Sequence, residues 1–255
     1  SIDNNTQAFR IGRKIVLDPN FLDSLNLGDR EAKRMQNKSS AAAEKMITEV
    51  QDPSEELQRL LSIRTPELID YQNVGYAKTY IDFVSKVRKQ EILIGSDTRM
   101  SETVARYLFK LMAYKDEYEV ARLHRSGDFH QAIKDQFGDK TKVTYKLHPP
   151  SMKRLGLDKK IGLGKSGDMA FAVLTKMKFL RGKGIDPFGN TRHRKLERAL
   201  IPEYMETIDS CLERLSSDNY ENAVEIAALP DMIRGYEEIK EANVERYREA
   251  VQNLL

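Results

Sequence analysis

Apolar residues recur at intervals of three and four positions along most of this chain, the spacing that places them on one face of an α-helix. The first such face contains Ala8, Ile11, Ile15 and Val16, and Pro19 ends that helix. Alternating apolar and polar positions, the mark of a half-buried strand, are rare. The pattern therefore predicts a mainly α-helical protein.

The segment 26–53 departs from this pattern because it is polar and rich in alanine and serine. We expect a loose connection with some helix there, and the part of the chain most prone to disorder. Helical periodicity resumes at Ser54, a good N-cap residue, and Pro66 suits the first turn of the next helix. These observations divide the chain into an N-terminal helix (1–25), a polar connection (26–53) and a helical C-terminal domain (54–255).

A long helix is expected from Ser101 to about Leu123, because no glycine or proline interrupts this segment. Apolar side chains occupy more than one of its faces, so the helix should be largely buried and its charges should be paired. Lys115 reaches Glu119 four positions on, and Arg122 lies three positions beyond Glu119. Asp116 and Glu117 remain for partners on other helices or another chain. We predict a partly buried ion-pair network that fixes the helix register.

Residues 141–148 form the clearest strand signal, with β-branched and aromatic residues before Pro149 and Pro150. We expect one small β element, a strand or hairpin, at this point. The following "GLGKSG" (162–167) matches a nucleotide-binding glycine pattern but lacks the surrounding strand–helix–strand unit, so a flexible loop is the prediction. Further helices are expected near 168–181, 190–215 with a break at Pro202, 218–228, and from Ile233 to the C-terminus.

The stretch "GIDPFGNTRHRKLER" begins with a turn at Asp186, followed by Phe188, and continues into a helix that Thr191 can cap. Arg192, His193, Arg194 and Lys195 then crowd the first turn of that helix. Positive charges at this position oppose the helix dipole unless an anion or an acidic partner compensates them. The stretch is therefore either a solvated basic turn or a docking contact.

The composition narrows the classes of function. The 255 residues carry a net charge of only +3, which argues against a nucleic-acid-binding protein. Cys211 is the only cysteine, which excludes an intrachain disulfide and a four-cysteine metal site and favours a reducing, cytoplasmic location. A small buried thiol is expected at that position. No run of about 20 apolar residues suggests a membrane span. The histidine spacing predicts no metal site, and no catalytic constellation is evident.

Several long strings resemble one known family. They are "LFKLMAYKDEYEVARL", "KLHPP", "FLRGKGIDPFGNTRHRKLERALIPEY" and "AALPDMIRGYEEIKEANVERYREA", supported by "NNTQAFRIGR" and "IDYQNVGYAKTYIDFVSKV". In this order they resemble the C-terminal region of fused indolepyruvate ferredoxin oxidoreductases. The likeness covers nearly the whole chain and is weakest over 26–53. The opening "SIDNN" is expected to continue from a preceding catalytic domain.

The resemblance implies a parent enzyme that decarboxylates aryl 2-oxoacids oxidatively to acyl-CoA and passes electrons to ferredoxin. That enzyme uses thiamine diphosphate, iron–sulfur clusters and CoA, and none of these cofactors is expected to bind in this segment. The expectation is a structural or assembly domain that docks on the catalytic domains or subunits of the same oxidoreductase, or on a second copy of itself, with no nucleic-acid or membrane partner. The candidate contact residues are Lys115, Asp116, Glu117, Glu119, Arg122, Asp186, Phe188, Arg192 and Arg194.

Two alternatives remain open. In the first alternative, the domain contributes contacts to CoA or substrate, and Lys183, Arg192 and Arg194 bind a phosphate group. In the second, the chain is a free-standing helical adaptor unrelated to redox chemistry.

Overall fold

The structure is a computed structural model that describes residues 41–95, 97–125, 135–138, 145–147, 161–163 and 165–255. The prediction of a mainly helical protein is confirmed. The described residues begin with the helices α4 (Ala41–Ile47), α5 (Glu55–Tyr71), α6 (Val74–Ile94), α7 (Arg99–Met112) and α8 (Glu117–His124). After the strands β1 (Tyr145–Leu147) and β2 (Ile161–Leu163) come α11 (Lys165–Lys176), the 3-10 helix η1 (Met177–Leu180), α12 (Arg192–Glu213), α13 (Tyr220–Ala228), the 3-10 helix η2 (Leu229–Met232) and α14 (Glu237–Leu254).

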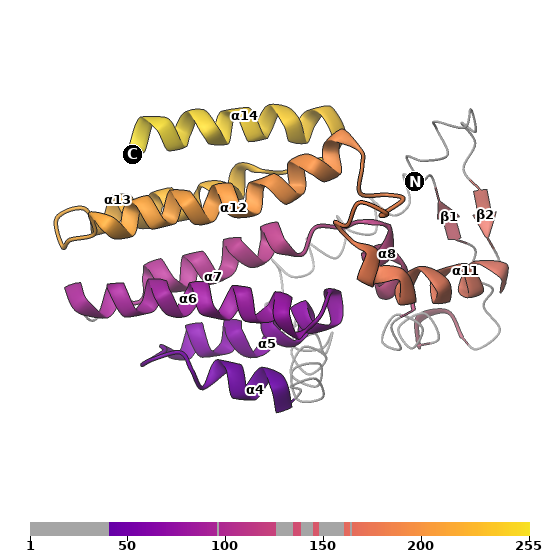
Figure 1. Ribbon diagram of the computed structural model, residues 1–255, viewed down its shortest axis with the longest axis horizontal. Coiled ribbons are helices and arrows are strands. Elements are labelled where there is room, and N and C mark those ends of the chain that lie inside the picture. Colours follow the sequence, from indigo (N-terminus) through magenta and orange to yellow (C-terminus); the bar gives the residue numbers. More distant parts are fainter. Residues whose placement is uncertain (1–40, 96, 126–134, 139–144, 148–160, 164) are drawn as a thin grey trace, which may run out of the picture.

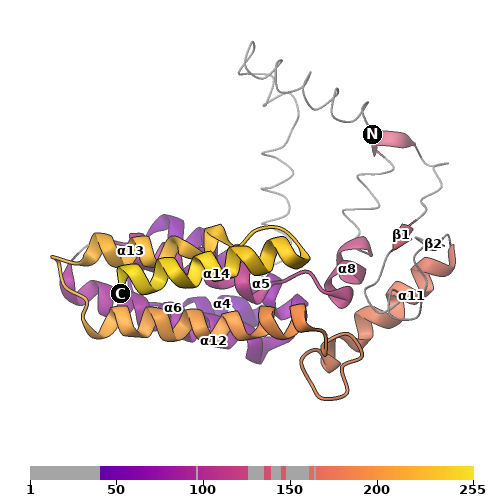
Figure 2. The ribbon, with the colours of Figure 1, turned by 90° about the horizontal axis from the view of Figure 1, so that it is seen from above.

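Most of the helices form one elongated bundle, in which α4–α7 lie beside α12–α14 (Figures 1 and 2). Helices α8 and α11 pack on each other at one end of this bundle, and β1 and β2 lie beside α11. The C-terminus lies toward the opposite end of the bundle. The molecule therefore has a large helical bundle and a smaller end region that the segments around residues 113–116 and 181–191 join to it.

The core of the bundle is built where α5, α6 and α7 pack on one another and on α12 and α13. Leu57, Ile81, Val84 and Leu108 are completely buried there. Each such side chain contributes about 1.5–3 kcal/mol by leaving water. The amphipathic pattern that predicted these helices is therefore explained by this shared core.

The core begins earlier in the chain than the pattern indicated. Helix α4 and the residues after it lie within the segment expected to be a loose connection, yet Ala43, Met46, Ile47 and Val50 are buried. These apolar residues recur at helical spacing and pack against α5 and α6, which outweighs the polar composition around them. The boundary expected at residue 54 therefore falls inside the packed unit. Residues 26–40, like the helix expected around 8–19, lie outside the described residues.

The long helix expected from Ser101 to Leu123 is wrong, because the chain leaves the helix after Met112 and begins α8 at Glu117. Side chains cause this break. The Asp116 carboxylate accepts a hydrogen bond from the Glu119 N–H and so caps α8. Hydroxyl groups from other helices satisfy two carbonyls around the break: Tyr76 donates to Met112 O at 2.9 Å and Tyr71 donates to Tyr114 O at 3.0 Å.

Two expected helix boundaries at prolines are also wrong. Pro66 lies inside α5, and the new helix begins only at Val74, where Asn73 caps it by accepting from the Tyr76 N–H. Pro202 lies inside α12, which continues to Glu213. Tertiary packing along both helices outweighs the local loss of one hydrogen bond at each proline. By contrast, the caps predicted at Ser54 and Thr191 are confirmed.

The two strands pair antiparallel, with Tyr145 opposite Leu163 and Leu147 opposite Ile161. Of the segment 141–148, only β1 lies within the described residues. Gly162 belongs to β2 and Gly167 to α11, so these two glycines are in regular structure and not in a flexible loop. Residues 135–137 are helical, and Gly138 after them has a φ of 84°.

The described helices include none with the length and apolar character needed to span a lipid bilayer.

Candidate functional site

The charged residues singled out in the sequence meet where α8 and α11 join the bundle. We call this cluster the α8 junction, defined by Tyr71, Asp116, Tyr118, Arg181 and Asp186. At its centre Arg181 forms two parallel hydrogen bonds to the Asp116 carboxylate, at 2.5 and 2.8 Å. Both side chains are only 5% exposed. A buried, two-pronged arginine–carboxylate pair of this kind fixes geometry as well as charge.

Arg181 also holds the end of α5. Its guanidinium donates to the backbone carbonyl of Tyr71 and, at 3.0 Å, to the side-chain oxygen of Gln72. It lies 3.6 Å from the centre of the Tyr71 ring, within range of a cation–π contact. A single side chain therefore joins the C-terminus of α5, the cap of α8 and the segment after η1.

Asp186 organises the turn that leads into α12. Its carboxylate accepts from the backbone N–H of Gly182 at 2.8 Å, from that of Phe188 at 3.1 Å and from the Tyr118 hydroxyl at 2.9 Å. Burial acts to raise the pKa of Asp186, but these hydrogen bonds outweigh it and hold the pKa below its usual value. The Phe188 ring meets Tyr118 edge-on at 5.4 Å. A side chain at Gly189 would collide with Asp186, since a Cβ there would lie 2.3 Å from its Oδ2.

A chain of ion pairs runs from α8 to α14. Glu117 accepts from Arg194 at 3.3 Å, Arg194 pairs with Glu197 at 2.6 Å, and Glu197 pairs with Lys240 at 2.6 Å. Burial raises the pKa of Glu117. Burial acts to lower the pKa of Arg194, but Glu197 and Glu117 outweigh it and raise that pKa. The acidic partner that the basic first turn of α12 requires is therefore supplied from within the chain at Arg194.

Glu119 and Arg122 pair on α8 at 2.8 Å, and Arg122 also reaches Glu67 of α5 at 2.8 Å. Lys115 does not make the expected pair with Glu119, because it lies before α8 and not on one continuous helix with it. It is exposed and makes no hydrogen bond or ion pair within the part of the chain that the structure describes. Arg192 and His193 contact Glu241 of α14, at 3.0 Å each, and the Arg192 side chain is 85% exposed.

Next to the α8 junction lies a pocket of about 710 Å³, which we call the basic pocket. Its wall comes from the end of α7, the segment 113–115, the first turn of α12 and the start of α14, with Arg64 from α5. Six lysine or arginine side chains line it: Arg64, Lys110, Lys115, Arg194, Arg234 and Lys240. Glu197 is the one acidic side chain in the described lining. The volume falls in the range typical of small-molecule sites.

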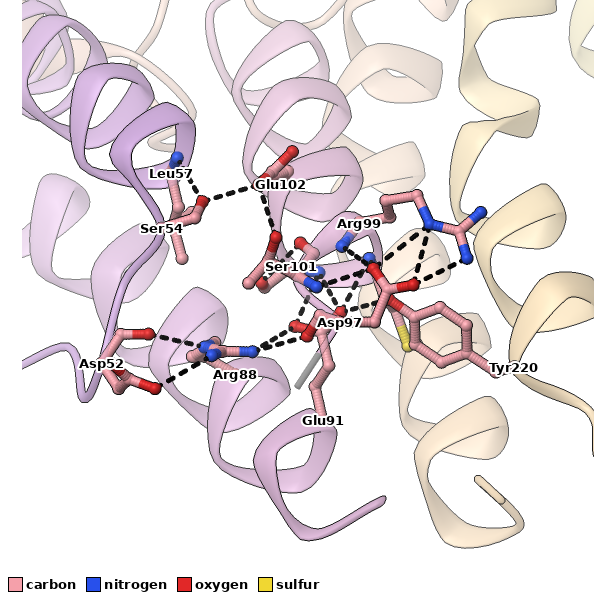
Figure 3. Close-up of polar contacts among 12 residues, drawn as sticks. Asp52, Ser54, Leu57, Arg88, Glu91, Asp97, Arg99, Ser101, Glu102 and Tyr220 are labelled. Carbon is pink, nitrogen blue, oxygen red and sulfur yellow. Dashed lines mark hydrogen bonds and ion pairs between the residues drawn. The ribbon is translucent and has the colours of Figure 1, made fainter. Parts of the chain in front are cut away.

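A second polar cluster lies inside the bundle, around the completely buried Glu91 of α6 (Figure 3). Glu91 accepts from the Tyr220 hydroxyl at 2.6 Å and from the Met100 N–H at 2.8 Å, at the start of α7. Arg88 pairs with Glu91 at 3.3 Å and donates to the carbonyl of Asp52 at 2.9 Å. This cluster joins α6, α7 and α13. The Arg88 and Glu91 side chains at its centre are only 3% and 0% exposed, which indicates a structural role.

Two kinds of reactive centre, a metal site and a cysteine nucleophile, were considered among the described residues. They contain no group of three or more histidine, cysteine, aspartate or glutamate side chains placed to hold a metal ion. Cys211 is buried, as predicted, and burial raises the pKa of its thiol, which disfavours the reactive thiolate.

Several acidic members of these clusters were expected from the sequence, but Arg181, Arg88 and Glu91 were not. Arg88 and Glu91 lie three positions apart on α6 in line with buried apolar residues such as Val84 and Val87. A charged pair within an apolar stripe is the signal that could have identified them from the sequence. Arg181 had no such signal, because its partner Asp116 is distant in sequence.

Fold and site together define a helical bundle with an ion-paired end region and a cation-lined pocket. Residues 57–253 match the sequence model of DUF6537, a protein family of unknown function, and the chain belongs to this family. Neither the curated proteins nor the solved structures contain a match to the chain.

Proposed function

We propose that this chain is a helical assembly module of an indolepyruvate (aryl 2-oxoacid) ferredoxin oxidoreductase, acting in the cytoplasm. The parent enzyme would decarboxylate a 2-oxoacid to acyl-CoA with ferredoxin as electron acceptor. Thiamine diphosphate, the iron–sulfur clusters and the main CoA site are assigned to its other domains. The module docks on those catalytic domains, or on a second copy of itself, and holds them in place. The small β element expected near β1 (Tyr145–Leu147) is part of this proposal.

The observation that carries the docking role is the exposure of large apolar side chains on the end region. Val173 on α11, Phe179 on η1 and Ile185 after η1 are 53%, 59% and 75% exposed. We call the stretch from Val173 to Ile185 the docking segment. Three large apolar side chains exposed in one short segment favour a protein contact, although a single exposed one would be unremarkable. The α8 junction holds this segment at Arg181 and Gly182, which lowers the entropic cost of docking.

The docking role is tested by tagging the chain in its native cell and identifying the co-purifying polypeptides by mass spectrometry. We expect subunits or domains of a thiamine-dependent 2-oxoacid oxidoreductase, or this chain as part of such a polypeptide. The double substitution Phe179→Ser and Ile185→Ser should reduce recovery of separate subunits or activity of a fused enzyme. Leu93→Ser is the matched control, because Leu93 is also 75% exposed but lies at the end of α6. Equal effects of the two variants would refute the docking segment.

Charge reversal of Arg192 and Arg194, two of the candidate contact residues, would also test docking, but the result at Arg194 would be ambiguous. Arg194 is only 16% exposed and pairs with Glu117 and Glu197, so reversing it also disturbs the fold. Arg192→Glu alone is usable, since that side chain projects into solvent.

A second candidate is a domain that contributes contacts to CoA or substrate. One observation favours it: Arg194 lines the basic pocket. Lys183 and Arg192, the other two cations named for this role, are absent from the described lining. In the complete enzyme, Lys183→Gln and Arg192→Gln should raise the KM for CoA and leave assembly intact if this candidate is correct. An unchanged KM would reject a role of Lys183 and Arg192 in CoA contacts and leave only Arg194, which lines the basic pocket.

The third candidate is a free-standing adaptor. Measuring the size of the native protein distinguishes it from the assembly module and from the domain that contacts CoA or substrate. An antibody against this chain should detect a band far above 29.3 kDa if the chain is part of a fused enzyme. A band at that size, with no oxidoreductase subunit co-purifying, would favour the adaptor and reject the assembly role.

A further inference from the structure

The basic pocket carries more positive charge than its own carboxylates neutralise. Within 4.0 Å of its six lysine and arginine side chains, the described residues provide three carboxylates, those of Glu117, Glu197 and Asp231. Two of these are each shared by two cations. The excess of three positive charges therefore lies around a concave surface, where the field of neighbouring cations adds up.

Two of the cations have no carboxylate partner in the described part of the chain. Arg64 lies over the Phe109 ring at 4.6 Å and donates to a backbone carbonyl at 3.5 Å. Lys115 is exposed at the break between α7 and α8. A third, Lys110, is held by the carbonyls of Pro230 and Asp231 at 2.9 and 3.2 Å, and burial lowers its pKa. Each of these groups would be stabilised by an incoming anion.

The pocket also lies at the start of two long helices. Thr191, which caps α12, and Tyr236, which precedes α14, both line it. The positive ends of both helix dipoles therefore add to the field of the side chains. The Tyr236 side chain makes no capping hydrogen bond, so the first N–H groups of α14 are not capped by it. Such N–H groups are preferred partners of phosphate oxygens.

An aromatic surface accompanies the charges. Tyr236 is 79% exposed at the pocket, and Phe109 and Tyr114 also line it. A flat ring of a ligand can stack on an exposed tyrosine, and this contact would add to the affinity that the charge–charge attraction provides. A ligand that carries both phosphate groups and an aromatic ring would use every part of this lining.

We propose that the basic pocket binds a small molecule of the nucleotide type, with its phosphates held by Arg64, Lys115 and the start of α14 and its ring on Tyr236. The pocket's volume, about 710 Å³, accommodates a ligand of that size. This inference is independent of the assembly role: it concerns a small-molecule site on the bundle, whereas the docking segment lies on the end region. Failure of one would leave the other standing.

The test is isothermal titration of the full chain with ADP, coenzyme A, inorganic pyrophosphate and adenosine. We expect ADP or coenzyme A to bind most tightly, pyrophosphate less tightly and adenosine least. Tighter binding of coenzyme A than of ADP would support the site and identify its natural ligand as a CoA derivative. No binding by any of the three phosphate-bearing probes would overturn the proposal.

Matched variants locate the site. Lys115→Gln should weaken ADP binding about tenfold, the loss of one charge-assisted contact. Lys195→Gln is the control, because Lys195 is also exposed but does not appear in the described lining of the pocket. It should change the affinity less than twofold. Equal losses in the two variants would reveal non-specific attraction and overturn the proposal.

The ring contact is tested separately with Tyr236→Ala. This change should weaken the binding of ADP several-fold and leave the binding of pyrophosphate unaffected. The same loss for both probes would overturn the stacking part of the proposal. Because Tyr236 and Lys115 are both exposed, neither substitution is expected to prevent folding.

Discussion

The substitution Asp116→Asn separates the charge of the α8 junction from its capping role. Asparagine is as good an N-cap as aspartate, so the hydrogen bond from the Glu119 N–H, 2.8 Å in the structure, can be kept. The negative charge opposite Arg181 is lost, and that guanidinium is left buried without its counter-ion. Removing one partner of a buried ion pair costs about 3–5 kcal/mol. Because Arg181 retains its contacts with Tyr71 and Gln72, we expect the lower end, about 3 kcal/mol.

Urea unfolding followed by far-ultraviolet circular dichroism measures this loss as a shift of the midpoint at constant m-value. Arg192→Ala is the control, since the Arg192 side chain is 85% exposed and its pair with Glu241 should contribute less than about 1 kcal/mol. A loss of about 3 kcal/mol is a large part of the total stability of a domain, so the difference between the two variants is easily resolved.

A double substitution completes the test. Arg181→Met together with Asp116→Asn removes both charges and leaves no unpaired ion, so it should cost less than the sum of the two single changes. Simple addition of the single effects would mean that Arg181 and Asp116 do not interact energetically. An Asp116→Asn loss no greater than that of Arg192→Ala would refute the reasoning as a whole.

Three further outcomes are expected. Gly235→Ala should lower stability by about 1–3 kcal/mol, because φ is 90° and the new Cβ would lie 2.7 Å from Ile239 Cγ2; Gly184→Ala, with nothing within 4 Å, should be nearly neutral in the same urea assay. Asp186→Asn should lower the free energy of unfolding by its full amount above about pH 4, and this loss should shrink as the pH falls through the lowered folded-state pKa of Asp186. Unfolding curves of both proteins at several pH values measure the difference, and a difference that does not change with pH would contradict the expectation. The Cys211 thiol, 7% exposed and with a raised pKa, should react with a disulfide reagent far more slowly in the folded chain than in urea, and equal rates would contradict its burial.

How much of this fold the sequence could predict depended on the range of the interactions. The helical class and the caps at Ser54 and Thr191 rest on contacts within a few residues, and these were read correctly. The helix boundaries at Pro66 and Pro202 were wrong, because packing along the whole helix outweighs one missing hydrogen bond.

The candidate site was predictable only in part for the same reason. Asp116 and Glu117 stood out as charges within an apolar stretch, and the structure gives them partners in Arg181 and Arg194. Those partners lie 65 and 77 residues away, and sequence spacing carries no information about such pairs. The basic pocket was not predicted at all, since its cations come from separate segments that only the folded chain brings together.

The end of α7 has a consequence for comparing relatives of this chain. The Met112 carbonyl at this end accepts a hydrogen bond from the hydroxyl of Tyr76, 36 positions earlier. The end of α7 therefore depends on a residue of a different helix, α6. A relative with phenylalanine at position 76 would have to supply another donor or let α7 run on, even with an identical sequence around position 112. Substitutions at these two positions are therefore expected to be correlated within the family. An alignment that treats each position independently would therefore misplace the break between α7 and α8.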